Sequence, residues 1–226
     1  MAKTISIAID GPAGAGKSTI ARRIAAEMGY YYVDTGAIYR TVAYFMDLLG
    51  ISPKDADGVE RYIDELTINI EYDENGLQHM IMNGMDVTGD IRTQDISQKA
   101  SLISALPVVR EVLLDMQREV ARQHNVVMDG RDIGTVVLPD ANVKIFLTAS
   151  AEVRAKRRTD ELIAKGQQAD YNRILQEIQQ RDYQDTHRAI APLKMAKESV
   201  KVDTSDMTIE EVVTTIRNIV TEKTAK

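Results

Sequence analysis

The sequence predicts an α/β fold with a mostly parallel sheet, and three observations support this prediction. A buried strand, a glycine-rich loop and an amphipathic helix follow one another over residues 4–28. Further apolar runs of strand length recur at 30–33, 125–129, 143–147 and 199–203. Helical patterns separate most of these runs, and strands joined through helices lie parallel with right-handed crossovers.

The first half of the chain alternates strand and helix and then changes its period. The helix after the glycine-rich loop ends at Gly29, and a second helix runs over residues 34–49, where Gly50 stops it. Residues 51–66 are polar and predict a loop with a short helix.

An inserted antiparallel meander is predicted over residues 67–92. Apolar residues alternate from Ile68, the pair Asn75-Gly76 is a hairpin signal, and Asn83-Gly84 is a second one. The segment therefore reads as two strands and a possible third at 85–87, inserted into the parallel frame.

The second half of the chain returns to helices and buried strands. Helices are predicted at 94–105, at 107–123 with Pro107 at its start, at 151–164 and at 171–188. Residues 130–142 read as a polar, glycine-containing loop. A capping box, Thr208-Ile209-Glu210-Glu211, opens the last helix.

Composition limits the class of protein. The 226 residues suffice for one substantial domain, and 44% of them are hydrophobic. The absence of cysteine excludes disulfides and thiolate metal sites and fits the cytoplasm, where we expect the protein. We see no secretion signal and no run long enough to cross a membrane. The net charge of −6 argues against a nucleic-acid polymer as partner, so an anionic ligand must be held by a local cluster of cations.

A complete phosphate-binding pattern follows the first strand. The pattern G-x-x-x-x-G-K-S is formed by Gly11-Pro12-Ala13-Gly14-Ala15-Gly16-Lys17-Ser18, hereafter the phosphate loop. Glycines let backbone N–H groups face anionic oxygens, and the following helix adds its positive end. We expect Lys17 to reach the β- and γ-phosphates of a nucleoside triphosphate and the Ser18 hydroxyl to ligate Mg²⁺.

Three acidic residues end predicted strands, and ligands of parallel sheets bind at that edge. They are Asp10, Asp34 and Asp129. We expect Asp129 to help hold Mg²⁺ through water. The segments that directly follow these strand ends are where the chemistry is expected.

Two motifs at this edge suit a second phosphate. Thr35 and Arg40 lie about one helical turn apart, so a hydroxyl and a guanidinium can face one cavity, although a plain helix cap with a surface arginine would look the same. Arg131 and Asp132 follow a strand end in a glycine-framed loop. A surface ion pair there would contribute only ~0–1 kcal/mol, so ligand contact is favoured.

Two helices carry further charged sets. Arg181, Asp185 and Arg188 share one helical face and could grip a sugar and a base, or form an exposed ion-pair stripe. The helix at 151–164 carries four basic residues, which are Arg154, Lys156, Arg157 and Arg158. Such a helix suits a lid that closes an arginine over a transferring phosphoryl group, and the alternative is a solvated basic face.

Six segments taken together resemble the bacterial cytidylate kinases, which are phosphate-loop nucleoside monophosphate kinases. They are residues 11–19, 34–40, 91–93, 129–135, 144–147 and 188–193. Each motif is shared with relatives, but the set in this order is specific and covers nearly the whole chain. The resemblance implies that a monomer transfers the γ-phosphoryl group of ATP, with Mg²⁺, to CMP and dCMP.

The resemblance also implies a three-layer sandwich with a mostly parallel five-stranded sheet. Residues 1–226 would form one domain with its core at about 1–50 and 94–226, a substrate-binding β insertion at about 60–93 and a short helical lid at about 151–170.

The resemblance assigns roles residue by residue. Residues 11–18 and Thr19 would bind ATP. Thr35, Arg40 and Arg131 would hold the CMP phosphate, and Thr35 keeps the hydroxyl of the serine that many relatives have. Cytosine would be read by Ser101, Arg110, Asp132 and Arg188, and ribose by Arg181 and Asp185. Lys17, Arg131, Arg157 and Arg181 would stabilise the transferring phosphoryl group.

Two rival functions are weighed against this one. The first is a kinase of the same fold with another acceptor. The second is a nucleotide-gated switch. The segment most similar to the guanine-binding motif of such switches is Val200-Lys201-Val202-Asp203, which lacks the asparagine. The acidic pair expected of a motor-type hydrolase does not follow the strand at 126–129.

Overall fold

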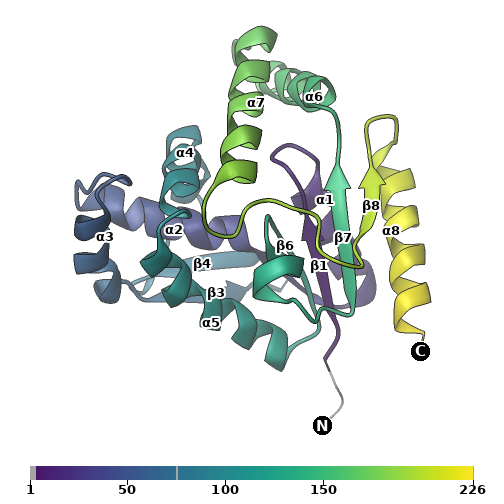
Figure 1. Cartoon of the computed structure of the whole chain (residues 1–226), viewed down its shortest axis with the longest axis horizontal. Helices are drawn as coiled ribbons and strands as arrows, with labels where there is room; N and C mark the ends of the chain where they lie inside the picture. The colour runs from purple at the N-terminus through teal and green to yellow at the C-terminus, as the bar shows by residue number, and fades with distance from the viewer. Residues whose placement is uncertain (1–3, 75, 226) are drawn as a thin grey trace.

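A fully parallel five-stranded sheet forms the centre of the protein (Figure 1). The computed structural model describes residues 4–74 and 76–225. In order across the sheet the strands are β2 (Tyr31–Asp34), β6 (Val126–Gly130), β1 (Ser6–Asp10), β7 (Val143–Thr148) and β8 (Val200–Asp203). Each neighbouring pair is parallel, which confirms the predicted sheet.

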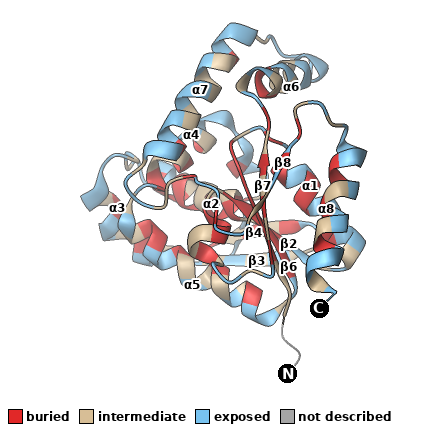
Figure 2. Cartoon of the chain, turned by 45° about the vertical axis from the view of Figure 1, so that its right-hand side comes forward, coloured by how far each residue is buried: buried red, intermediate tan, exposed pale blue. Residues whose placement is uncertain are grey.

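Helices cover both faces of the sheet because successive strand residues point to opposite sides. Ala8, Val33 and Met128 pack in one core cluster, and Ile7 and Val127 pack in the other. The central strands are therefore buried on both faces (Figure 2), which is why they read as continuous apolar runs.

The helices have bounds close to the predicted ones. They are α1 (Lys17–Met28), α2 (Thr35–Leu48), α3 (Ala56–Tyr62), α4 (Gln94–Ile103), α5 (Pro107–Gln123), α6 (Ala151–Ala164), α7 (Tyr171–His187) and α8 (Ile209–Thr224). Short 3₁₀ turns lie at Ile63–Glu65 (η1) and Asp90–Arg92 (η2). The predicted capping box opens α8, where Thr208 and Glu211 exchange hydrogen bonds. Among the described residues, no helix combines the length and the apolarity needed to cross a membrane.

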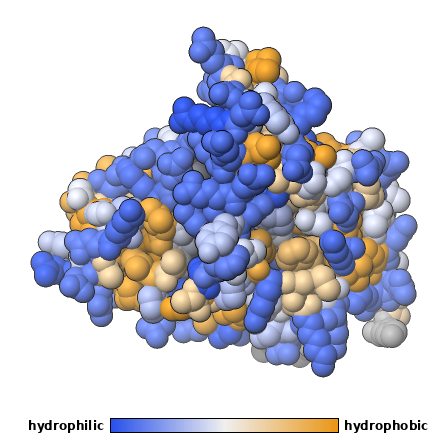
Figure 3. Space-filling model, turned by 45° about the horizontal axis from the view of Figure 1, so that its top comes forward, coloured by the Kyte–Doolittle hydropathy of each residue, from blue (hydrophilic) through white to orange (hydrophobic). Residues whose placement is uncertain are grey.

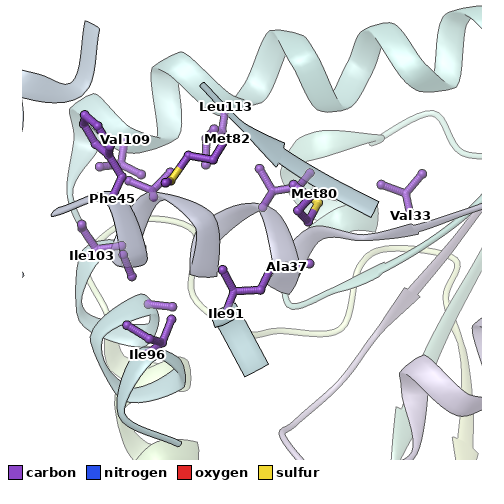
Figure 4. Packing of buried hydrophobic residues seen from close by; sticks show 14 of the residues in the cluster. Val33, Ala37, Phe45, Met80, Met82, Ile91, Ile96, Ile103, Val109 and Leu113 are labelled. Carbon is purple, nitrogen blue, oxygen red and sulfur yellow. The ribbon is translucent and has the colours of Figure 1, made fainter. Parts of the chain in front are cut away.

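The inserted meander is a three-stranded antiparallel sheet of β3 (Ile68–Tyr72), β4 (Gln78–Met82) and β5 (Met85–Asp86). Asn83 and Gly84 have φ angles of 48° and 83°, as a two-residue hairpin turn requires. The other predicted turn includes Asn75, which lies outside the described residues. Met80 and Met82 of β4 pack into the core cluster that contains α2 (Figure 4).

The connection between β6 and β7 differs from its prediction as a loop. It forms a π-helical turn over Ile133–Val137 (η3). The first two N–H groups of this turn, from Ile133 and Gly134, each donate to the Asp10 carboxylate at 2.7 Å. Burial raises the pKa of Asp10 to about 6, although both hydrogen bonds oppose the rise. Asp10 therefore fixes the segment directly after the strand that carries Asp129.

A glycine at the end of β1 allows a close contact that the fold requires. Gly11 has a φ of 151°, and a Cβ there would lie 1.9 Å from the Leu147 carbonyl oxygen of β7. We predict that Gly11→Ala lowers the free energy of unfolding by about 3 kcal/mol or more, because backbone strain and overlap add. Thermal unfolding measures this as a fall of about 6 °C or more.

Gly89→Ala is the matched control for this prediction. Nothing lies within 4 Å of a Cβ at Gly89, and its φ is −74°. Its melting temperature should stay close to that of the parent, and an equal fall in both variants would contradict the explanation.

Candidate active site

A cavity of about 250 Å³ opens at the carboxyl ends of β1, β2 and β6, where the sequence places the chemistry. Its wall is built from the phosphate loop, the start of α2, helix α4, the end of β6 and the face of α7. Hydrophilic residues cover the centre and top of this side of the molecule (Figure 3). Twenty residues line the cavity, and twelve of them carry roles implied by the resemblance: Ala13, Gly14, Lys17, Ser18, Thr35, Arg40, Ser101, Arg131, Asp132, Arg181, Asp185 and Arg188.

The phosphate loop is shaped to present N–H groups. Gly14 and Gly16 have φ angles of 75° and 87°, and Gly16 starts α1 with no side-chain cap on the first helical N–H groups. The buried Lys17 side chain lies across the loop, and its Nζ donates to the Pro12 carbonyl oxygen at 2.8 Å. Burial, together with the nearby charge of Arg131, lowers the pKa of Lys17.

Ser18 and Asp129 meet beside the loop. The Ser18 hydroxyl donates to Asp129 Oδ2 at 3.0 Å, and the Tyr32 hydroxyl donates to Oδ1 at 2.9 Å. Burial raises the pKa of Asp129, and the charge of Asp34 raises it further. A hydroxyl oxygen and a carboxylate oxygen this close together are ligands of the type that Mg²⁺ prefers, so Ser18 and Asp129 fit the predicted role.

Three arginines face the phosphate loop across the cavity. Arg40 pairs with Asp34 at 3.0 Å, and Arg131 Nε donates to Asp185 Oδ2 at 2.8 Å. Arg181 lines the same wall, and burial first and Arg131 second lower its pKa to about 10.

Two of these guanidinium groups are incompletely satisfied. The Nε atoms of Arg40 and Arg181 are buried and have no hydrogen-bond partner among the described residues. Buried donors without partners are rare in native structures, and these two belong to residues that line a cavity rich in positive charge. An anion bound in the cavity would satisfy them and relieve the repulsion between the cations.

A second polar cluster lies next to the arginines. Arg110 pairs with Asp132 through a buried salt bridge, and Arg188 Nη2 lies 3.5 Å from the other Asp132 oxygen. Ser104 joins them, because its carbonyl oxygen accepts from Arg110 at 3.2 Å and its hydroxyl accepts from Arg188 at 3.4 Å. The Ser104 hydroxyl donates to the Ser101 carbonyl oxygen at 2.9 Å. The cluster therefore presents fixed donors and acceptors of the kind that read a polar ring edge.

Asp185 of α7 is the buried partner of Arg131. It is 5% exposed, and burial alone would raise its pKa. The charge and hydrogen bond of Arg131 outweigh that effect and hold the pKa of Asp185 below its usual value. Asp185 is therefore ionised at neutral pH and keeps Arg131 oriented.

Thr35 lies in the cavity with its hydroxyl proton engaged. Its Oγ1 donates to the Asp129 carbonyl oxygen at 2.8 Å and so joins the ends of β2 and β6. Because its proton is engaged, the hydroxyl can only accept a further hydrogen bond, and Thr35 lines the cavity together with Gly36 at the start of α2.

The structure does not bring Arg157 to the cavity. Its guanidinium donates to the Thr204 hydroxyl at 3.1 Å and to the Thr204 carbonyl oxygen, after β8. Arg154, one turn earlier on α6, lies at the phosphate loop instead: it is 4% exposed, donates to the Ala13 carbonyl oxygen at 3.0 Å and pairs with Asp182 of α7. Sequence reasoning named Arg154 only as one of four basic residues, because nothing in the sequence tells which of them turns inward.

One cavity over the strand ends is thus lined both by the phosphate loop and by a group of arginines. This combination defines a phosphate-loop phosphotransferase.

Comparison with known proteins gives the family. The family model for cytidylate kinase matches residues 7–222. The chain is 49% identical to a cytidylate kinase of Ligilactobacillus salivarius, with 99% of each chain covered. It is 48% identical to a cytidylate kinase of Carboxydothermus hydrogenoformans, with 96% of this chain and 97% of that one covered. The chain belongs to the cytidylate kinase family, whose members are ATP-dependent phosphotransferases that act on nucleotides.

A solved structure supports the fold. An uncharacterized protein of Eubacterium ventriosum superposes with a TM-score of 0.52 at 14% identity, covering 97% of this chain and 99% of that one. At this identity the likeness concerns the fold alone.

The unpaired arginine donors predict stabilisation by anions. Inorganic pyrophosphate at low millimolar concentration should raise the melting temperature by about 3 °C or more, because binding to the folded state alone stabilises it. Arg181→Gln should lose much of this increase, since one of the two unsatisfied donors is removed. Arg173→Gln, on the exposed side of α7, is the control and should keep it. Equal gains in all three proteins would contradict the interpretation.

Proposed function

We propose that the protein transfers the γ-phosphoryl group of ATP to CMP and dCMP, giving ADP and CDP or dCDP. One observation supports this most strongly: Arg40, Arg131 and Arg181 face the phosphate loop across one cavity, and two of them have unsatisfied buried donors. Phosphoryl transfer asks mainly for alignment and charge neutralisation, and this cavity offers both.

ATP phosphates would lie on the loop of residues 11–19. Lys17 would leave the Pro12 carbonyl oxygen to reach the β- and γ-phosphates. A bound polyphosphate favours the charged form of the amine and so reverses the effect of burial on the pKa of Lys17.

Ser18 and Asp129 would hold Mg²⁺, the serine through its hydroxyl and the carboxylate through water. When bound, the ion neutralises charge on the β- and γ-phosphate oxygens. The Tyr32 hydroxyl keeps Asp129 oriented for this role.

The acceptor phosphate would lie against the start of α2, held by Arg40 and Arg131 with Thr35 beside them. Its attacking oxygen is already ionised at neutral pH, so no general base is required. Arg181 and Asp185 would hold the ribose, and Arg181, which lines the same cavity as Arg131, would help to neutralise the charge of the transferring phosphoryl group.

Cytosine would be read by the cluster of Asp132, Arg110 and Arg188, with Ser101 at its rim. Carboxylate and guanidinium groups together match a ring edge that both donates and accepts. The buried salt bridge fixes their geometry before the base arrives.

The segment at about 151–170 would act as the lid over the transferring group. Arg157 would have to release Thr204 to take part, whereas Arg154 already lies at the loop. Closure would exclude water, the competing acceptor.

Action as a monomer is part of this proposal and rests on the family resemblance alone. We also propose that the protein acts in the cytoplasm, because the proposed reaction consumes ATP and CMP.

Measuring ADP release from ATP with and without CMP tests the proposal. A kinase releases ADP only with its acceptor, whereas a nucleotide-gated switch hydrolyses ATP slowly without one. We expect CMP and dCMP to exceed UMP, AMP and shikimate as acceptors. A clear preference for one of the last three would overturn the assignment of the base-reading cluster.

Arg131→Ala should lower kcat by about 10³-fold, because an arginine that neutralises a transferring phosphoryl group is worth at least this much. Steady-state kinetics at saturating ATP and CMP measure the loss. Arg173→Ala removes an exposed ion pair with Glu177 on the same region of the fold and should leave kcat unchanged. An unchanged rate in Arg131→Ala would remove Arg131 from the site.

A further inference from the structure

The outer edge of β2 is covered by side chains instead of another strand. β2 is the last strand on its side of the sheet, so alternate residues present backbone groups away from β6. The Tyr32 carbonyl oxygen accepts from the Tyr72 hydroxyl at 2.9 Å. Two residues on, the Asp34 N–H donates to Gln78 Oε1 at 2.7 Å, and the Asp34 carbonyl oxygen lies 3.4 Å from Gln78 Nε2. The edge is thus satisfied by two residues of the inserted sheet.

These two side chains belong to one rung of the β3–β4 hairpin. Tyr72 and Gln78 are paired directly opposite each other in the antiparallel register. Gln78 is 8% exposed, and its amide is occupied by Asp34 and by the Met80 sulfur. A buried amide is costly unless it is hydrogen-bonded, so the position of this rung is tightly specified. We call Tyr72 and Gln78 the edge pair.

Apolar contacts also join the insertion to β2: the Tyr72 ring packs edge-on against Tyr31, and Met80 lies in the same core cluster as Val33. A second cavity of about 280 Å³ lies beside the edge pair, between β4, the end of β2 and α1. Arg22, Leu77 and Arg92 line it together with Gln78 and Asp34. Beside this cavity, the hydrogen bonds of the edge pair link the insertion to the backbone of β2.

The residue that Gln78 holds is also the one that orients the acceptor site. Asp34 caps α2 through Oδ1, which accepts from the Ala37 N–H at 2.9 Å. Its other oxygen accepts from Arg40 Nη2 at 3.0 Å. A shift of the Asp34 backbone therefore moves both the start of α2 and the Arg40 guanidinium.

We propose that Tyr72 and Gln78 are positioning residues for the phosphoryl acceptor: they hold the Asp34 backbone so that its carboxylate places Arg40 and the α2 N-terminus. The inference rests on the proposed function, because it assigns these groups to the acceptor phosphate. Neither residue touches the cavity that holds the reacting groups. Their effect falls on acceptor binding, whereas the phosphate loop lies on the other side of the cavity.

Gln78→Met tests the proposal. Methionine keeps the length of the side chain and removes both hydrogen bonds to Asp34. We expect the KM for CMP to rise about tenfold, because a buried N–H loses its partner, while kcat and the KM for ATP change by less than about threefold. A KM for CMP within twofold of the parent, in a parent that phosphorylates CMP, would overturn the proposal.

Thr88→Val is the matched control. The Thr88 hydroxyl accepts from the Met80 N–H at 2.8 Å, so the variant loosens the insertion without touching β2. It should lower the melting temperature as Gln78→Met does, yet leave the KM for CMP unchanged. Equal increases in both variants at equal stability would mean that the insertion acts only by being folded, and the proposal would fail.

Two further variants sharpen the result. Tyr72→Phe removes one hydroxyl and keeps the ring that packs on Tyr31, so it should fold and raise the KM for CMP about threefold. If Gln78→Met does not accumulate, no increase in Tyr72→Phe overturns the proposal. In a double-mutant cycle, Arg40→Lys and Gln78→Met should raise the KM for CMP less than additively, because both act through Asp34. Full additivity would also overturn it.

Absence of CMP-dependent ADP release in the parent is a separate failure, because it would refute the proposed function before any variant is compared.

Discussion

The structure depends on keeping several buried cations within reach of one another. Buried guanidinium groups repel one another and lose their hydration, and carboxylates placed beside them offset part of both costs. The chain supplies such partners for several of them: Asp34 for Arg40, Asp185 for Arg131, Asp182 for Arg154, and Asp132 for both Arg110 and Arg188. This explains how an acidic protein of net charge −6 builds a cavity for anions.

The parallel sheet positions three carboxylates at the edge of the cavity or directly beside it. Asp10, Asp34 and Asp129 end neighbouring strands, whose parallel register brings Asp34 level with Asp129 and Asp10 level with Gly130. Each carboxylate accepts hydrogen bonds from a different part of the site. Asp10 holds the π-helical turn, Asp34 caps the start of α2, and Asp129 holds Ser18 beside the phosphate loop. The backbone of the sheet therefore sets the spacing of the groups that the two nucleotides would meet.

Much of this arrangement follows from local sequence. The bounds of α6 and the start of α5 at Pro107 were predictable because caps and proline act within a few residues. The phosphate loop was predictable because its glycines and lysine are adjacent. The resemblance to a family supplied the residues of the second cluster, which the structure brings together around Asp132.

The remainder depends on partners far away in the chain. The turn at 133–137 forms because Asp10 lies below it, which no local pattern reveals. In the sequence Gln78 resembles any polar residue of an alternating strand, because its role depends on a hydrogen bond to the outer edge of β2, which is distant in the chain. Arg154 and Arg157 carry the same charge three residues apart, and only the packing of α6 on α7 separates their roles.

The covered edge of β2 has a consequence for the protein in a crowded solution. An open strand edge is a template on which a second molecule can add its own strand, the first step of sheet-mediated aggregation. A tyrosine hydroxyl occupies the Tyr32 carbonyl oxygen and a glutamine amide occupies the Asp34 N–H, two of the groups that such a strand would need. The insertion therefore also blocks the addition of a strand at this edge.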